Sequence, residues 1–211
     1  MKIYNILLAE YNPRELFNEE YFKGGRSNYN DYLRDHRFPL VARALTEIFG
    51  LEGRLVLDAG CAVPYLVDEL RKLGVHAVGF DISDYARRKA VLERLEDFLQ
   101  ADACKTPFRD RSFYMVIASE LVEHIPDFLE DTILRELTRL ADKYLLIRTP
   151  YCHDPEDNDV THVNIHPWMY WVSRVEEMGF IHDDELYARF AVRGHREFRY
   201  FFDEFMVFVR T

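Results

Sequence analysis

The sequence predicts a doubly wound α/β domain, in which a mostly parallel sheet of seven strands carries helices on both faces. Short β-rich apolar segments such as VLDA and MVIAS alternate with amphipathic segments of helical spacing. Gly50, Gly74 and Gly179 each follow a helical segment, as expected for residues that end helices. Strands and helices in alternation favour parallel strands buried beneath helices.

The elements follow in a regular order. The segment up to about residue 35 is polar and rich in tyrosine, and a helix with Pro39 in its first turn ends at Gly50. We expect strands at residues 54–59, 76–81, 97–102, 112–119 and 143–150. We expect helices at residues 64–73, 83–95 and 131–141.

The C-terminal part has a helix and two expected strands. Pro167 opens the helix, and its tryptophans Trp168 and Trp171 recur at the spacing of a buried face. Residues 185–210 are predicted to form an antiparallel edge hairpin that turns near Gly194. Its aromatic side chains suit the acceptor pocket or a homodimer contact.

Composition narrows the class of protein. The 211 residues are 48% hydrophobic and 30% charged, which is typical of a globular protein with one sizeable core. The net charge of −10 disfavours nucleic acid as a partner, because that affinity depends largely on Lys and Arg. No apolar run approaches the roughly 18 residues of a membrane span, and no signal peptide is recognised. Three widely spaced cysteines favour a reducing compartment, so we expect a cytoplasmic protein.

We predict one domain over residues 1–211. Residues 1–50 would form an N-terminal lid and helix, and residues 51–150 a cofactor-binding core. Residues 151–211 would supply a loop on the substrate side, a helix and the terminal strands.

Polar residues stand where the expected strands end. In a doubly wound sheet, ligands bind beyond the carboxyl ends of the strands. Asp81 follows Asp58 by 23 residues (81 − 58), close to the roughly 20-residue spacing of a carboxylate that accepts both ribose hydroxyls. Each of these acids has helix capping as its alternative role. The strand-end set comprises Asp58, Gly60, Asp81, Asp102, Ala103, Ser119 and Glu120.

The turn after the first strand reads GCAVP, with Gly60 its only glycine. A nicotinamide dehydrogenase is therefore disfavoured, since its phosphate-binding turn needs glycines that let the pyrophosphate reach backbone N–H groups. Pro64 suits the first position of a helix, where its missing N–H has no helical partner. A cofactor without phosphates remains compatible with this turn.

The motifs together resemble class I S-adenosylmethionine-dependent methyltransferases. VLDAGCAVP, VGFDIS, FLQADACKTPF, SFYMVIASELVEHIPD and LRELTRLADKYLLIRTP have that family's order and spacing over residues 54–150. The later THVNIHPWMYWVSRVEEMGF resembles the helix before that family's last strands. The early EEYFKGG resembles the lid of a subset that acts on small molecules or glycans. Ala62 and Pro64 depart from the family, which commonly has glycines at both positions.

The resemblance implies a Rossmann-like methyltransferase fold, S-adenosylmethionine as cofactor and a small-molecule or glycan-like acceptor methylated at oxygen or nitrogen. Asp58, Ala59 and Gly60 would line the methionine portion. Tyr21 is our candidate for a hydrogen bond to the cofactor carboxylate. The remaining implied positions are Asp81 for the ribose, Ile82, Asp102 and Ala103 for the adenine, and Ser119 and Glu120 beside the sulfonium and the substrate entrance.

Two histidines are catalytic candidates. His124 follows Glu123 in LVEHIPD and can act as a general base, because imidazole titrates near neutral pH; its alternative role is to order the loop. His162 is the reserve candidate. Pro167 prevents His162 and His166 from sharing one helical face, so we expect no metal site and read residues 151–167 as a substrate-side loop with solvated acids. A non-catalytic cofactor- or partner-binding domain with a degenerate glycine turn is the alternative function.

Overall fold

One sheet of seven strands organises the chain. The computed structural model describes residues 11–25, 27, 31–150, 158–195 and 204–211. The strands are β1 (Leu55–Ala59), β2 (His76–Asp81), β3 (Phe98–Gln100), β4 (Phe113–Ser119), β5 (Ala141–Arg148), β6 (Phe180–His182) and β7 (Phe205–Arg210). They lie in the order β3-β2-β1-β4-β5-β7-β6. The first five are mutually parallel, and β7 runs antiparallel between β5 and β6, which confirms the predicted fold class.

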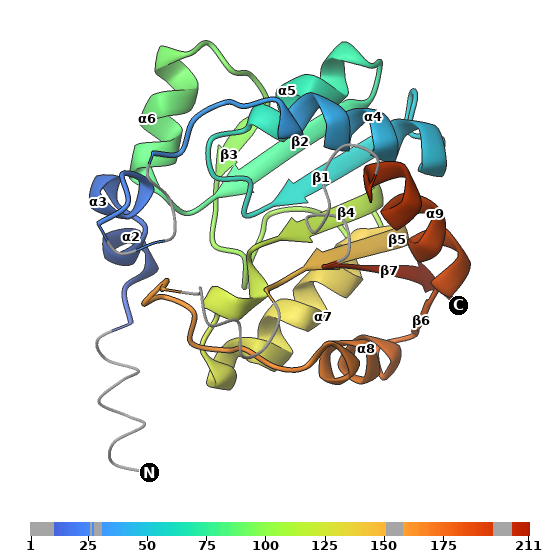
Figure 1. The fold of residues 1–211 in the computed structure, drawn as a ribbon. Helices are drawn as coiled ribbons and strands as arrows, with labels where there is room; N and C mark the ends of the chain where they lie inside the picture. The colour runs from blue at the N-terminus through green and yellow to red at the C-terminus, as the bar shows by residue number, and fades with distance from the viewer. Residues whose placement is uncertain (1–10, 26, 28–30, 151–157, 196–203) are drawn as a thin grey trace.

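The helices of the model mostly follow the predicted positions. They are α2 (Pro13–Leu16), α3 (Glu19–Phe22), α4 (Arg37–Phe49), α5 (Tyr65–Lys72), α6 (Asp84–Leu92), α7 (Glu130–Leu140), α8 (Trp168–Glu176) and α9 (Asp184–His195). Figure 1 shows the sheet between two layers of helices, with α2 and α3 beside the end of the sheet. None of the helices in the described ranges is long and apolar enough to cross a membrane.

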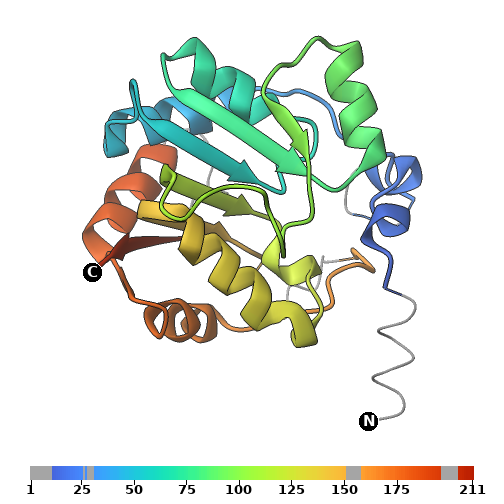
Figure 2. The same cartoon turned by 180° about the vertical axis from the view of Figure 1, so that it is seen from behind.

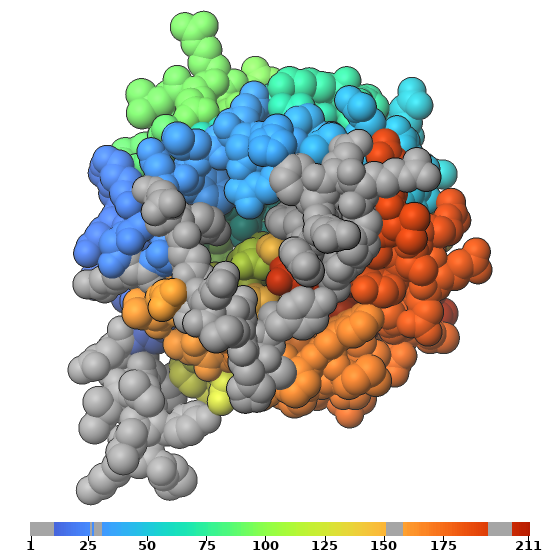
Figure 3. Space-filling model, in the orientation of Figure 1, coloured from blue at the N-terminus to red at the C-terminus, as the bar shows by residue number. Residues whose placement is uncertain are grey.

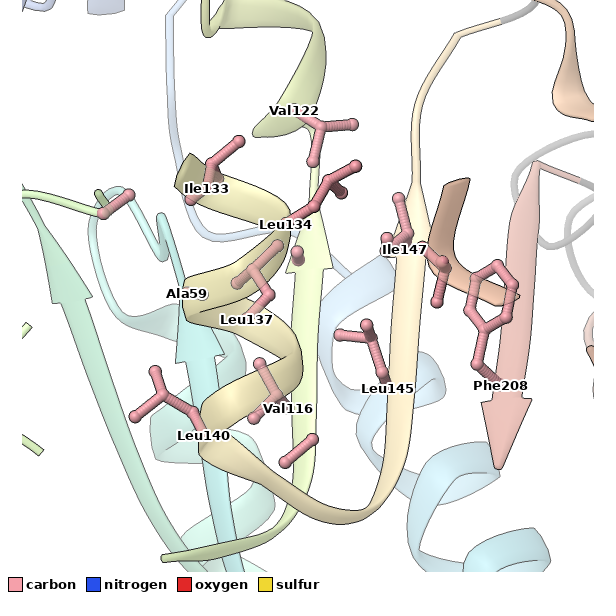
Figure 4. Close-up of a cluster of buried hydrophobic side chains, with 14 of the residues drawn as sticks. Ala59, Val116, Val122, Ile133, Leu134, Leu137, Leu140, Leu145, Ile147 and Phe208 are labelled. Carbon is pink, nitrogen blue, oxygen red and sulfur yellow. The ribbon is translucent and has the colours of Figure 1, made fainter. Parts of the chain in front are cut away.

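Two hydrophobic cores hold the layers to the sheet. On one face, side chains of α4, α5 and α9 pack against the strands. On the other face, α7 and α8 do so, and the two views of the ribbon show these helices on the opposite side from α4 and α5 (Figures 1 and 2). In Figure 4 the apolar face of α7 lies over β4 and β5, with Leu134 and Leu137 facing Val116 and Leu145.

The predicted core role of the α8 tryptophans is confirmed. Trp171 is fully buried in the core beneath α8, and Trp168 packs against its edge.

The prediction for residues 185–210 is wrong in its first half. Residues 184–195 form the helix α9, and the strand that pairs with β7 is the earlier β6. The Asp183 carboxylate accepts the Leu186 N–H at 2.8 Å and so caps α9. Phe190 recurs four residues after Leu186, and its ring meets Phe49 of α4 at a centroid distance of 5.9 Å. Helical spacing and a cap therefore prevail over the β-rich composition.

Candidate active site

A cavity of about 650 Å³ lies at the carboxyl ends of β1, β2 and β4. The space-filling view shows a hollow on this face, between the N-terminal segments in blue and the later chain in orange (Figure 3). Ten of the twelve predicted site residues line the cavity: Tyr21, Asp58, Gly60, Asp81, Ile82, Asp102, Ala103, Ser119, Glu120 and His124. The Ala59 side chain instead lies in the core, and His162 lies behind His124, with ring centroids 4.7 Å apart.

Two carboxylates mark one end of the cavity. Asp58, at the end of β1, is 5% exposed, and burial together with the nearby Asp81 raises its pKa to about 7. The Asp81 carboxylate accepts the N–H groups of Ala62 at 2.9 Å and Ser83 at 2.8 Å. Burial still raises the pKa of Asp81. The pair thus favours a cation as its neighbour.

The turn after β1 approaches the cavity closely. Gly60 has a φ of +70°, which favours glycine, and a Cβ there would lie 2.9 Å from the Leu121 side chain, so that side chain would have to shift. Pro64 has a φ of −73° and stands one position before the helix, as the residue that precedes Tyr65. The helix α5 therefore begins one residue later than predicted, and Pro64 precedes it as the cap residue.

Ala62 occupies the left-handed region, with a φ of +50°. Its N–H nevertheless donates to Asp81, which holds the turn in place. We predict that Ala62→Gly raises the free energy of unfolding by about 0.5–1 kcal/mol, because glycine adopts positive φ without the strain of a Cβ.

Urea denaturation would measure this gain, with Ala90→Gly as the matched control. Ala90 lies within α6, where the same exchange should destabilise by about 1 kcal/mol. A loss of stability in Ala62→Gly would contradict the strain assigned to the turn.

Arg148 is a cavity residue that the sequence reasoning missed. It ends β5, and its guanidinium bonds Glu120 at 2.5 Å and also Glu204. Glu120 itself has a φ of +56°, and its N–H donates to the Arg148 carbonyl at 2.8 Å. A charged residue at the end of the buried strand LLIR was the available signal, because β5 is parallel to β4 and ends at the same edge of the sheet.

His124 also lines the cavity, from the short helix Val122–His124 after β4. Its Nδ1 lies 2.9 Å from the Thr161 hydroxyl and 3.3 Å from the Thr161 carbonyl. The hydroxyl donates to Asp159 at 2.6 Å, and a carbonyl only accepts, so Nδ1 carries the proton. The lone pair of the neutral ring therefore lies on Nε2.

Tyr21 is buried, although its segment is polar. It is 4% exposed and packs with Phe22 and Tyr85. Its hydroxyl lies 3.5 Å from His124 Nε2.

The later loop is partly buried. Asp159 is 9% exposed and accepts both the N–H and the hydroxyl of Thr161, so the prediction of a solvated acid is wrong here. The loop docks through Val163 and Asn164, whose N–H groups donate to the Glu123 carbonyl at 2.9 and 3.0 Å. The other acids of this stretch, Asp154, Glu156 and Asp157, lie outside the described residues.

The fold and the cavity define a class of protein, the doubly wound domains that bind a nucleotide-derived cofactor at the strand ends. The chain belongs to the methyltransferase domain family, whose model matches residues 32–196. This confirms the family resemblance.

Curated relatives match less than half of the chain. An O-methyltransferase of ubiquinone biosynthesis from Hahella chejuensis is 32% identical over 95 residues, which is 42% of this chain and 40% of that enzyme. Methyltransferase GfsG from Streptomyces halstedii is 38% identical over 96 residues, 42% of this chain and 34% of that protein. The chain spans less than half the length of these relatives.

A solved structure covers nearly the whole chain. Magnesium protoporphyrin IX methyltransferase from Synechocystis, solved with bound S-adenosylhomocysteine, has a TM-score of 0.67 at 21% identity and covers 94% of this chain and 98% of its own. The likeness at this identity supports the fold.

Proposed function

We propose that the protein transfers a methyl group from S-adenosylmethionine to a hydroxyl oxygen of a small molecule. The observation that carries the proposal is one cavity with paired carboxylates on β1 and β2 and an imidazole of fixed tautomer after β4. Membership of the methyltransferase domain family supports the reaction class, and the relatives named for O-methylation favour oxygen over nitrogen.

The residues on β1, β2 and β3 suit the cofactor. When bound, S-adenosylmethionine supplies a methyl group already activated on a sulfonium. Asp58 and Gly60 would hold its amino-acid portion, since a cation beside Asp58 offsets the cost of burying that charge. The wall of the cavity that would take the nucleoside consists of Asp81, Ile82, Asp102 and Ala103.

The residues after β4 suit the acceptor. Ser119 and Glu120 line the cavity, and His124 Nε2 lies 3.5 Å from the Tyr21 hydroxyl. An acceptor hydroxyl held there would give its proton to Nε2 while its oxygen attacks the methyl carbon in line with the departing sulfur. The products are a methyl ether, the neutral thioether S-adenosylhomocysteine and a protonated imidazole. A glycan-like acceptor remains compatible with this arrangement.

The raised pKa of Asp58 predicts a pH dependence of cofactor binding. Without ligand, the folded protein keeps a proton on Asp58 up to about pH 7, whereas the unfolded chain loses it near pH 4, so this group's contribution to stability falls as the pH rises through that window. A cationic ligand favours the carboxylate. Affinity for S-adenosylmethionine should therefore rise about tenfold between about pH 6 and about pH 8. Near pH 6, binding of the ligand should release the Asp58 proton.

Calorimetry in two buffers of different ionisation enthalpy counts the released proton. The control is Asp58→Asn, which has no proton to release at this position. Equal proton release by the two proteins would contradict the role given to Asp58.

Two measurements test the function itself. Calorimetry with S-adenosylhomocysteine and with NAD separates a methyltransferase site from a dinucleotide site, and we expect heat from the first ligand alone. Methyl-labelled S-adenosylmethionine, offered with phenols, catechols and hydroxylated sugars, then tests turnover. Binding without label transfer to any of these acceptors would favour the non-catalytic alternative.

A further inference from the structure

Glu123 is a buried acid without an evident role in the site described above. Its side chain is 0% exposed, and among the described residues neither carboxylate oxygen has a hydrogen-bond partner. Burying an ionised carboxylate without compensation is costly, so such a group normally has a cation or several donors.

Two histidines lie against this acid. A carboxylate oxygen of Glu123 and one ring nitrogen each of His124 and His162 lie within 4.8 Å of one another. The histidines come from segments 38 residues apart (162 − 124), so the fold and not the local sequence brings them together. We call Glu123, His124 and His162 the Glu–His–His cluster.

The chain holds this cluster in position from several sides. The backbone N–H groups of Val163 and Asn164 bond the Glu123 carbonyl, which fixes the His162 loop against the short helix that carries Glu123 and His124. Thr161 bonds both Asp159 and the His124 ring. Asp159 also lies 3.9 Å from His162 Nε2. Hydrogen-bonded neighbours of this kind orient the ligands of metal sites.

The donor set selects a class of ligand. Two imidazoles and one carboxylate suit divalent first-row transition metals such as zinc, cobalt or manganese, and leave coordination positions open. A divalent cation would also neutralise the buried Glu123. His162 and His166 are the histidines that the sequence places close together, whereas the fold brings His162 to Glu123 and His124.

We propose that the Glu–His–His cluster binds one divalent transition-metal ion at the wall of the cavity, where His124 lines the acceptor end. Its role, which rests on the proposed function, is to bind the acceptor oxygen and lower the pKa of the hydroxyl. The hydroxyl proton then passes to water, the oxygen forms the new bond to the methyl carbon, and the carbon–sulfur bond breaks. With the ion bound, His124 acts as a ligand and no longer as the base.

Cobalt titration tests the site without depending on turnover. The full chain is treated with a chelator, dialysed and titrated with Co²⁺, and binding is followed by visible d–d absorption and by calorimetry. We expect one equivalent to bind, and Glu123→Gln and His162→Gln each to weaken it at least about tenfold. His166→Gln is the matched control from the same loop, since its ring stacks on Tyr170 outside the cluster; it should bind Co²⁺ as the parent does.

Calorimetry with S-adenosylhomocysteine shows whether each variant keeps its fold. If Glu123→Gln does not fold, His162→Gln and the parent titration decide. Absence of Co²⁺ binding to the parent would overturn the site, and so would undiminished binding in a folded Glu123→Gln or His162→Gln protein. The buried Glu123 would then share a proton with a histidine instead of binding a metal ion.

Activity with and without chelator separates this inference from the proposed function. If cobalt binds, and binds more weakly to Glu123→Gln and His162→Gln, but no methyl group is transferred, the metal site is supported and the proposed function is contradicted. Full methyl transfer in chelator without cobalt binding defeats the metal site and leaves the function standing. Full transfer in chelator by a protein that does bind cobalt overturns the catalytic role of the ion.

Discussion

We expect His124→Ala to lower turnover about a hundredfold while affinity for S-adenosylhomocysteine stays nearly unchanged. The sulfonium is already an activated donor, so the remaining tasks are to align the two reactants and to remove the acceptor proton. His124 lines the acceptor end of the cavity, with its Nδ1 proton held by Thr161, and serves the second task as base or as metal ligand. Single-turnover kinetics with labelled cofactor would measure the loss.

The matched control is His166→Ala, which removes an imidazole of the later loop, outside the cavity lining, and should keep turnover. Because His124 is only 6% exposed, thermal unfolding of both variants should accompany the kinetics. Full turnover in His124→Ala would make His124 structural, and His162→Ala would be tested next. Full turnover in both variants would mean that the enzyme works by positioning alone or is not an enzyme.

We expect Asp81→Ala to weaken cofactor binding by about 1.5–3 kcal/mol, the range for hydrogen bonds to a charged group. Each Asp81 oxygen already accepts one backbone N–H, from Ala62 or Ser83, and has a further lone pair for a ribose hydroxyl. The substitution therefore removes both the ribose acceptor and the anchor of the turn after β1. Calorimetry with S-adenosylhomocysteine would give the difference.

Two further variants separate these effects. Asp81→Asn keeps one acceptor oxygen, so its loss should be smaller than that of Asp81→Ala. Asp84→Ala removes an exposed acid three residues away, which bonds the Gln100 side chain at 2.8 Å, and should leave affinity unchanged. Undiminished affinity in Asp81→Ala would remove the ribose assignment.

The parts of the fold that local periodicity encodes were predictable. Each of β1 to β5 is an apolar run bounded by turn residues, and the acids that follow β1 and β2 meet at one edge because parallel strands end together. The Asp58 and Asp81 pair could therefore be placed at one site from spacing and order alone. The direction in which a side chain points was harder to predict from the sequence: Ala59 was expected to line the cofactor site, but its side chain faces the core.

Features that depend on docking between distant segments were not predictable. The Glu–His–His cluster forms because the N–H groups of Val163 and Asn164 bond the Glu123 carbonyl after β4, and no local sequence pattern predicts that contact. Arg148 acquires its two glutamate partners in the same way. For α9, by contrast, Asp183 was a recognisable helix cap in the sequence, but the β-rich composition of residues 185–210 favoured a strand prediction.

The bond from the Ser83 hydroxyl to the Phe17 carbonyl, 2.6 Å long, ties the N-terminal segment to the residue that caps α6. Tyr11, Phe17 and Tyr21 of that segment form part of the cavity wall, so we expect a ligand bound in the cavity to oppose local opening of the segment. Amide hydrogen exchange at residues 19–22 would report the same event, and ligand binding should slow exchange there in proportion to occupancy.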